Sequence, residues 1–111
     1  MKKVAIPLQG EKLSAHFGHC EQFVIVEMED EKVHGESRHT PPQHAPGVYP
    51  RWLAGMGVHE IIAGGMGQKA IALFNQNNIQ VHLGVPEAHY QQIITDYLEN
   101  DMVTGDNRCD H

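Results

Sequence analysis

Hydrophobic positions along the chain alternate between short β-rich runs and stretches with helical spacing. Four apolar runs predict strands, at about residues 4–8, 23–26, 60–63 and 79–83, and the mostly polar stretch at residues 33–40 predicts an edge strand. Between and after the later runs, apolar residues recur three and four positions apart, which predicts helices at about residues 48–56, 68–75 and 86–98. The last helix gives the clearest signal, because its apolar and aromatic residues recur at i, i+3, i+4, i+7 and i+8 from Tyr90.

This order of elements predicts an α/β domain. Right-handed crossovers make the first, fourth and fifth strands parallel, and the charged turn at residues 29–32 joins the second and third strands as a hairpin. The second strand then lies antiparallel beside the first, and the polar third strand suits an edge of the sheet. We therefore expect a five-stranded mixed sheet in the order 3-2-1-4-5, with helices on both faces.

The length of 111 residues is that of one domain, and we expect a core over residues 1–99 followed by a tail over 100–111. The formal net charge of −6, without a basic run, argues against binding to nucleic acid. No apolar run is long enough to span a membrane, and residues 4–8 are too short for the apolar part of a signal peptide. We expect a soluble cytoplasmic protein, and its oligomeric state stays open.

The chain is rich in histidine and poor in cysteine. It has nine histidines, more than its Phe, Trp and Tyr residues together, and only two cysteines, Cys20 and Cys109. Two thiols in a cytoplasmic chain suit a metal or redox site better than a disulfide framework. The alternative is that most of the histidines are ordinary polar residues facing solvent.

The predicted topology brings three loops to one edge of the sheet. Between the first and fourth strands the winding of the chain changes direction, and open α/β sheets bind ligands at the carboxyl edge of such a point. Residues 14–20 follow the first strand, residues 64–67 follow the fourth, and the loop after the third strand contains His39 and His44. We expect these loops to converge there.

The first of these loops carries three candidate metal ligands within five residues, His16, His19 and Cys20. Imidazole and thiolate suit zinc, copper, iron and sulfur-containing clusters. Gly18 would let the loop fold tightly enough to aim the three side chains at one point. The alternative is a turn in which the histidines cap strand ends and Cys20 is a small buried hydrophobic residue.

The second loop is rich in glycine, with Gly64, Gly65 and Gly67 around Met66. Glycines between a strand and a helix allow the backbone to approach a ligand, and the exposed amides and the helix dipole favour an anion. Met66 would offer a thioether or simply pack in the core. A tight turn without a ligand is the alternative for this loop.

The chain ends in two further soft ligands, Cys109 and His111. The last helix runs away from the site, but its roughly 14 residues cover only about 21 Å. The 12-residue tail reaches about 36–40 Å when extended, so it can return to the site. The alternative is a frayed terminus.

The sequence indicates a binding protein rather than an enzyme. The first strand carries no Asp or Glu to hold magnesium, and no nucleophile-elbow or Ser-His-Asp pattern is present.

Taken in order, these residues resemble the small proteins of the dinitrogenase iron–molybdenum cofactor family. The likeness covers nearly the whole chain, in the segments Val4–Pro7, Leu13–Cys20, Pro46–Leu53, Ile62–Gly67 and Cys109–His111. It implies a ribonuclease-H-like, three-layer α/β/α fold. It also implies relatives that carry or help to assemble the iron–molybdenum cofactor, and others, the orange proteins, that hold a molybdenum–copper sulfide cluster. The cysteine motif of the longer radical-enzyme relatives is missing, so catalysis is not implied.

The leading hypothesis is a carrier of an anionic metal–sulfur cluster, of the iron–molybdenum or molybdenum–copper sulfide type, with cofactor-assembly proteins as partners. The residues expected to bind the cluster are His16, Gly18, His19, Cys20, His44, Gly64, Gly65, Met66 and Gly67. The expected metal ligands are His16, His19, Cys20, Cys109 and His111. The alternatives are a zinc or nickel site, a thiol oxidoreductase cycling Cys20 with Cys109, and a protein-interaction module.

Overall fold

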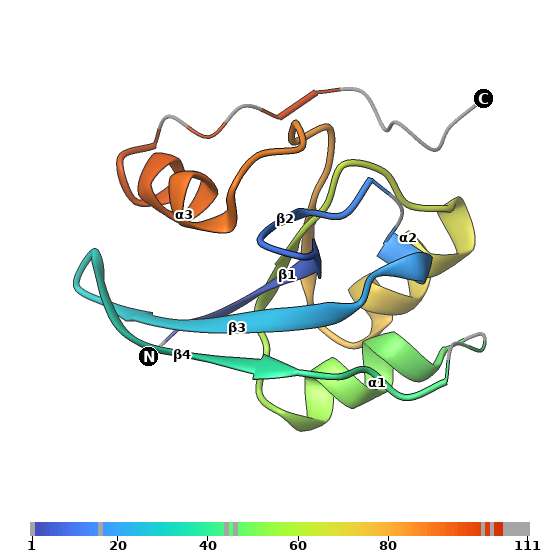
Figure 1. The fold of residues 1–111 in the computed structure, drawn as a ribbon. Helices are drawn as coiled ribbons and strands as arrows, with labels where there is room; N and C mark the ends of the chain where they lie inside the picture. Colours follow the sequence, from blue (N-terminus) through green and yellow to red (C-terminus); the bar gives the residue numbers. More distant parts are fainter. Residues whose placement is uncertain are drawn as a thin grey trace.

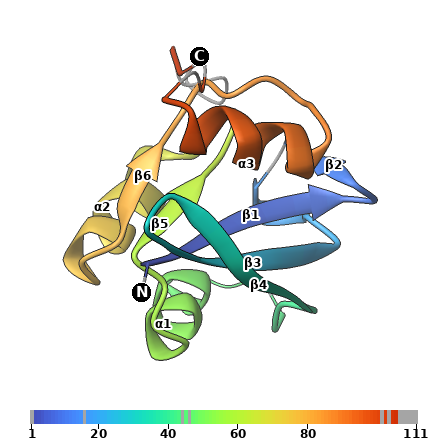
Figure 2. The ribbon, with the colours of Figure 1, turned by 90° about the vertical axis from the view of Figure 1, so that its left-hand side faces the viewer.

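The computed structural model is a mixed β-sheet with helices on both faces (Figures 1 and 2). It describes residues 2–15, 17–43, 45, 47–100, 102 and 104–105. The strands are β1 (Lys2–Gln9), β2 (Lys12–Leu13), β3 (Gln22–Glu29), β4 (Lys32–His39), β5 (Glu60–Ile62) and β6 (Gln80–His82). The helices are the 3₁₀ turn η1 (Phe17–His19), α1 (Val48–Gly55), α2 (Gln68–Gln76) and α3 (Tyr90–Leu98).

The order of the long sheet is the predicted one. It runs β4-β3-β1-β5-β6, with β1 antiparallel to β3 and parallel to β5. The three-layer α/β/α arrangement is therefore confirmed. The sequence analysis missed β2, a two-residue strand that pairs with the end of β1. Gly10 adopts a positive φ of 66°, which permits the tight turn between these two strands.

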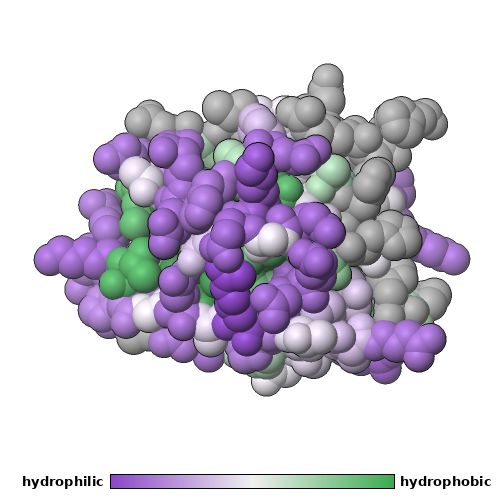
Figure 3. All heavy atoms as spheres, viewed as in Figure 1, coloured by the Kyte–Doolittle hydropathy of each residue, from purple (hydrophilic) through white to green (hydrophobic). Residues whose placement is uncertain are grey.

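The sheet is buried on both faces because β1 and β3 carry apolar residues at nearly every position. Ala5 and Phe23 belong to the buried cluster that includes α1 and α2, and Ile6 and Val24 belong to the cluster that includes α3. The edge strand β4 is mostly exposed, and the face of the molecule in Figure 3 is largely hydrophilic.

Two boundaries differ from the prediction. The helix expected from residue 86 begins only at Tyr90, because Nδ1 of His89 accepts a hydrogen bond from the amide of Gln91 and caps the helix there. His39 is the last residue of β4 rather than a loop residue, and its ring lies edge-on to Trp52. None of the helices in the described part of the chain is long and apolar enough to cross a membrane.

Candidate functional site

The loop that follows β1 is fixed to the carboxyl end of that strand from both sides. The amide of Ser14 donates to the carbonyl of Pro7 at 2.9 Å, and the amide of Glu21 donates to the carbonyl of Leu8 at 2.8 Å. The turn η1 lies between these two hydrogen bonds. The loop therefore stays at the edge of the sheet where the topology predicted a site.

Phe17 joins this loop to the helical layer below the sheet. Its ring lies edge-on to Tyr49 of α1 and to Phe74 of α2, with ring centroids 5.5 and 5.6 Å apart. The sequence analysis gave Phe17 no role, although an aromatic residue between candidate ligands was a signal that the loop is packed. Because Phe17 is only 7% exposed, the backbone around it is anchored to both helices.

Cys20 is buried in the same apolar cluster as Phe17 and is 9% exposed. Burial raises the pKa of its thiol to about 11, because the thiolate would lose its hydration. At neutral pH Cys20 is therefore a protonated thiol. A metal that binds it must displace this proton.

The glycine-rich loop lies next to the first loop, because β5 pairs in parallel with β1. Gly64 and Gly65 are buried, and Met66 is 1% exposed and belongs to the cluster of Phe17 and Cys20. Gly67 is exposed and occupies the N-cap position of α2, where it has no side chain to accept a hydrogen bond from the first amides. The first amides of α2 thus have no capping side chain, which leaves them suited to bind an anion.

The tail after α3 returns to this edge of the sheet. The amide of Gly105 donates to the carbonyl of Leu83 at 3.1 Å, and the amide of Gly84 donates to the carbonyl of Gly64 at 3.0 Å. Gly84 has a φ of +74°, and a Cβ atom there would lie 2.4 Å from the backbone of Gly105. The backbone of the tail therefore packs directly against Gly84, a role that the sequence analysis did not identify.

Comparison with known proteins identifies the family. The sequence model described as "Dinitrogenase iron-molybdenum cofactor" matches residues 1–100. The chain belongs to the dinitrogenase iron–molybdenum cofactor family. The chain is also similar to the uncharacterized protein MJ0580 of Methanocaldococcus jannaschii, with 37% identity over 87 residues, which is 74% of each chain.

Solved structures share the fold of this family member. The crystal structure of PH0822 has a TM-score of 0.88 and 27% identity, and the match covers 96% of this chain and 98% of that one. The apo form of the orange protein from Desulfovibrio gigas has a TM-score of 0.76 and 18% identity, covering 96% and 95% of the two chains. At that identity the likeness to the orange protein shows the fold alone.

Several residues expected to hold the family's cofactor lie outside the described residues, namely His16, His44, Cys109 and His111. The backbone of His19 lies in η1 beside Gly18, which is half-buried. Within the part of the chain that the structure describes, no three His, Cys, Asp or Glu side chains form a group that could hold a metal ion. The described geometry thus brings together two loops and the tail, and the expected ligand set stays a prediction.

Proposed function

We propose that this protein carries an anionic metal–sulfur cluster at the carboxyl edge of β1 and β5. The observation that carries the proposal is the meeting of three backbone segments at this edge: residues 14–20, residues 64–67 and the tail at Gly105. Membership of the dinitrogenase iron–molybdenum cofactor family supports a metallocluster as cargo. Binding rather than catalysis is the role we infer.

The chemistry of the two loops suits such a cargo. His16, His19 and Cys20 would supply soft nitrogen and sulfur donors to the metals. The amides of Gly65 to Gly67 would donate hydrogen bonds to the sulfides of the cluster. Phe17 and Met66 are buried in one apolar cluster beneath the two loops. They would give the site an apolar floor, which would protect the sulfides of the cluster from hydrolysis by water.

The tail would complete the ligand set. Gly105 lies against the edge of the sheet four residues before Cys109, and four extended residues span about 13 Å. We propose that Cys109 and His111 reach the cluster from this point, and that His44 approaches from the loop before α1.

The state of Cys20 weighs against a thiol oxidoreductase. Reactive thiols have a lowered pKa and lie in electropositive, partly exposed surroundings. Burial instead raises the pKa of Cys20 to about 11. A neutral buried thiol is a poor nucleophile but becomes a ligand when a metal displaces its proton.

The test is anaerobic reconstitution with tetrathiomolybdate together with copper(I) or iron, followed by visible absorption and by counts of metal and sulfide. We expect a coloured, stoichiometric complex that the double variant H16A/C20S loses. The matched control is His34→Ala, which removes an exposed histidine on the edge strand β4 and should leave binding unchanged. Equal uptake by both variants, or one zinc ion without sulfide, would contradict the proposal.

The pH dependence of binding separates two ways in which the histidines could act. If they are direct ligands, protons compete and affinity falls as the pH is lowered below their ordinary pKa of about 6.5. If they act only as positive charges, affinity rises over the same range. A flat profile between about pH 5.5 and 8 would count against both roles.

A further inference from the structure

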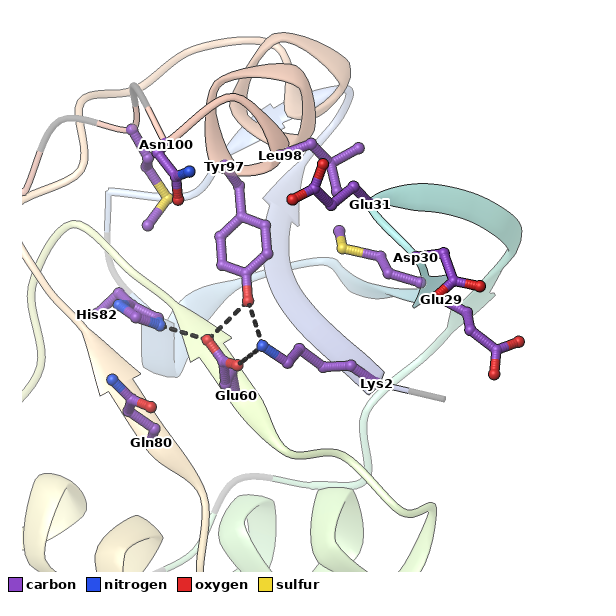
Figure 4. A pocket seen from close by; sticks show the side chains of 12 residues that line it. Lys2, Glu29, Asp30, Glu31, Glu60, Gln80, His82, Tyr97, Leu98 and Asn100 are labelled. Atoms are coloured by element: carbon purple, nitrogen blue, oxygen red, sulfur yellow. Dashed lines mark hydrogen bonds and ion pairs between the residues drawn. The ribbon is translucent and has the colours of Figure 1, made fainter.

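A hollow lies at the opposite edge of the sheet from the proposed cluster site (Figure 4). Its volume is about 700 Å³. Its floor is formed at the first residues of β1 and β5, and its walls come from α3 and from the turn between β3 and β4. Nothing in the cluster-carrier function uses this hollow.

The floor holds a buried carboxylate, Glu60, which is only 7% exposed. Its Oε1 accepts hydrogen bonds from His82 Nε2 at 2.6 Å and from the hydroxyl of Tyr97 at 2.9 Å, and its Oε2 pairs with Lys2 Nζ at 2.9 Å. Burial works to raise the pKa of Glu60, but these hydrogen bonds outweigh it and hold the pKa below its ordinary value. Glu60 is therefore a carboxylate that stays charged on the floor of the hollow.

The floor already recognises one alkylammonium group, that of the chain's own Lys2. The ammonium nitrogen of Lys2 pairs with Glu60 at 2.9 Å and donates a hydrogen bond to the hydroxyl of Tyr97 at 3.2 Å, so an ion pair and a neutral acceptor hold it together. The side chain of Lys2 is half exposed. Oε2 of Glu60 accepts from Lys2 alone among the described residues, and a carboxylate oxygen has room for a second donor.

The rim of the hollow is acidic. Glu29, Asp30 and Glu31 line it, and no ion pair within the described part of the chain neutralises them. Between floor and rim, Met28 lies opposite Lys2 in the register of β1 and β3, and Leu98 lines the α3 side. The hollow therefore offers negative charge at two places with apolar surface between them.

We propose that this hollow binds a linear aliphatic diammonium or polyammonium ion. One ammonium group donates to Glu60 beside or in place of Lys2, a second pairs with the rim at Glu31, and the methylene chain lies along Met28 and Leu98. The acidic rim repels anions. A compact divalent cation is a poorer fit, since no group of three suitable ligands exists among the described residues.

The test is calorimetric titration of the full-length, metal-free protein with putrescine and spermidine, using n-butylamine as the one-charged comparison at equal ionic strength. We expect saturable one-to-one binding, at least tenfold tighter for the two polyvalent amines than for n-butylamine. Glu31→Gln should weaken it several-fold, whereas Glu87→Gln, which removes one exposed charge elsewhere, should not. Equal losses in the two variants, or heats that do not saturate, would overturn the proposal.

A second pair of variants tests the floor. Lys2→Met frees Glu60 for the ligand and should tighten binding several-fold, whereas Lys69→Met on α2 removes the same charge at a distance and should not. Thermal unfolding of each variant shows that it is folded under the conditions of the titration. Equal effects of the two substitutions would mean that only the net charge of the protein matters, which would also refute a specific binding site in the hollow. Loss of cluster binding would leave these results unaffected, because that site lies at the other edge.

Discussion

At the scale of single residues, burial decides what two ionisable side chains of this fold can do. Cys20 has apolar neighbours, and burial raises the pKa of its thiol to about 11. Glu60 is about as buried, yet three donors hold it in its charged form. The same loss of water thus keeps one group neutral and leaves the other an ion, and the partners make the difference.

The raised pKa of Cys20 predicts slow alkylation. At pH 7 its thiolate fraction is about a hundredfold lower than that of an ordinary thiol, and the thiolate is the reacting species. In a Cys109→Ser variant, the rate with iodoacetamide should rise about tenfold per pH unit up to pH 10 and level off only near pH 11. The same variant in urea should level off near pH 9, the ordinary value. A folded-state plateau at or below pH 9 would contradict the burial argument.

At the scale of elements, glycines set how the ends of strands are connected. Gly10 and Gly84 both have positive φ angles, of 66° and 74°. A Cβ atom at Gly10 would meet nothing within 4 Å, whereas one at Gly84 would meet the backbone of Gly105 at 2.4 Å. Comparing alanine substitutions at the two positions therefore separates the free-energy cost of the left-handed backbone conformation from the cost of displacing the tail.

Gly84→Ala should release the tail, and Gly10→Ala should not. Each substitution places an alanine in the left-handed region, which costs about 1–2 kcal/mol of unfolding free energy. Only Gly84→Ala should also remove the hydrogen-exchange protection of the Gly105 amide and weaken cluster binding. Urea unfolding and amide exchange followed by NMR measure the two effects. If the Gly105 amide stays protected in Gly84→Ala, the packing of the tail does not depend on Gly84.

The sequence could predict the sheet because its central strands β1 and β3 are buried on both faces, which makes them long apolar runs. The chain topology then predicted which loops meet at the carboxyl edge. It left open whether Cys20 and Met66 are ligands or core residues, since burial depends on which aromatic rings cover them, and the structure places both in the core. The hollow around Glu60 was missed as well, although a charged residue at the start of a buried strand was its signal.

At the scale of the whole molecule, the two proposed sites experience the same net charge of −6 but take ligands of opposite sign. The molecule measures 33 × 29 × 25 Å. At 10 mM salt the Debye length is about 30 Å, so the total charge acts on both edges of the sheet. At 100 mM it is about 10 Å, and each site is governed by the groups around it.

Salt should therefore change the two affinities in opposite directions. Raising potassium chloride from about 10 to about 150 mM weakens the repulsion of tetrathiomolybdate and should speed its association, measured by stopped-flow absorption. The same change weakens the attraction of putrescine, and calorimetry should show a several-fold loss of affinity. If tetrathiomolybdate instead associates more slowly with added salt, the helix dipole and the histidines dominate the net charge at the carboxyl edge. In that case the local field at the end of α2, rather than the charge of the molecule, selects the anion.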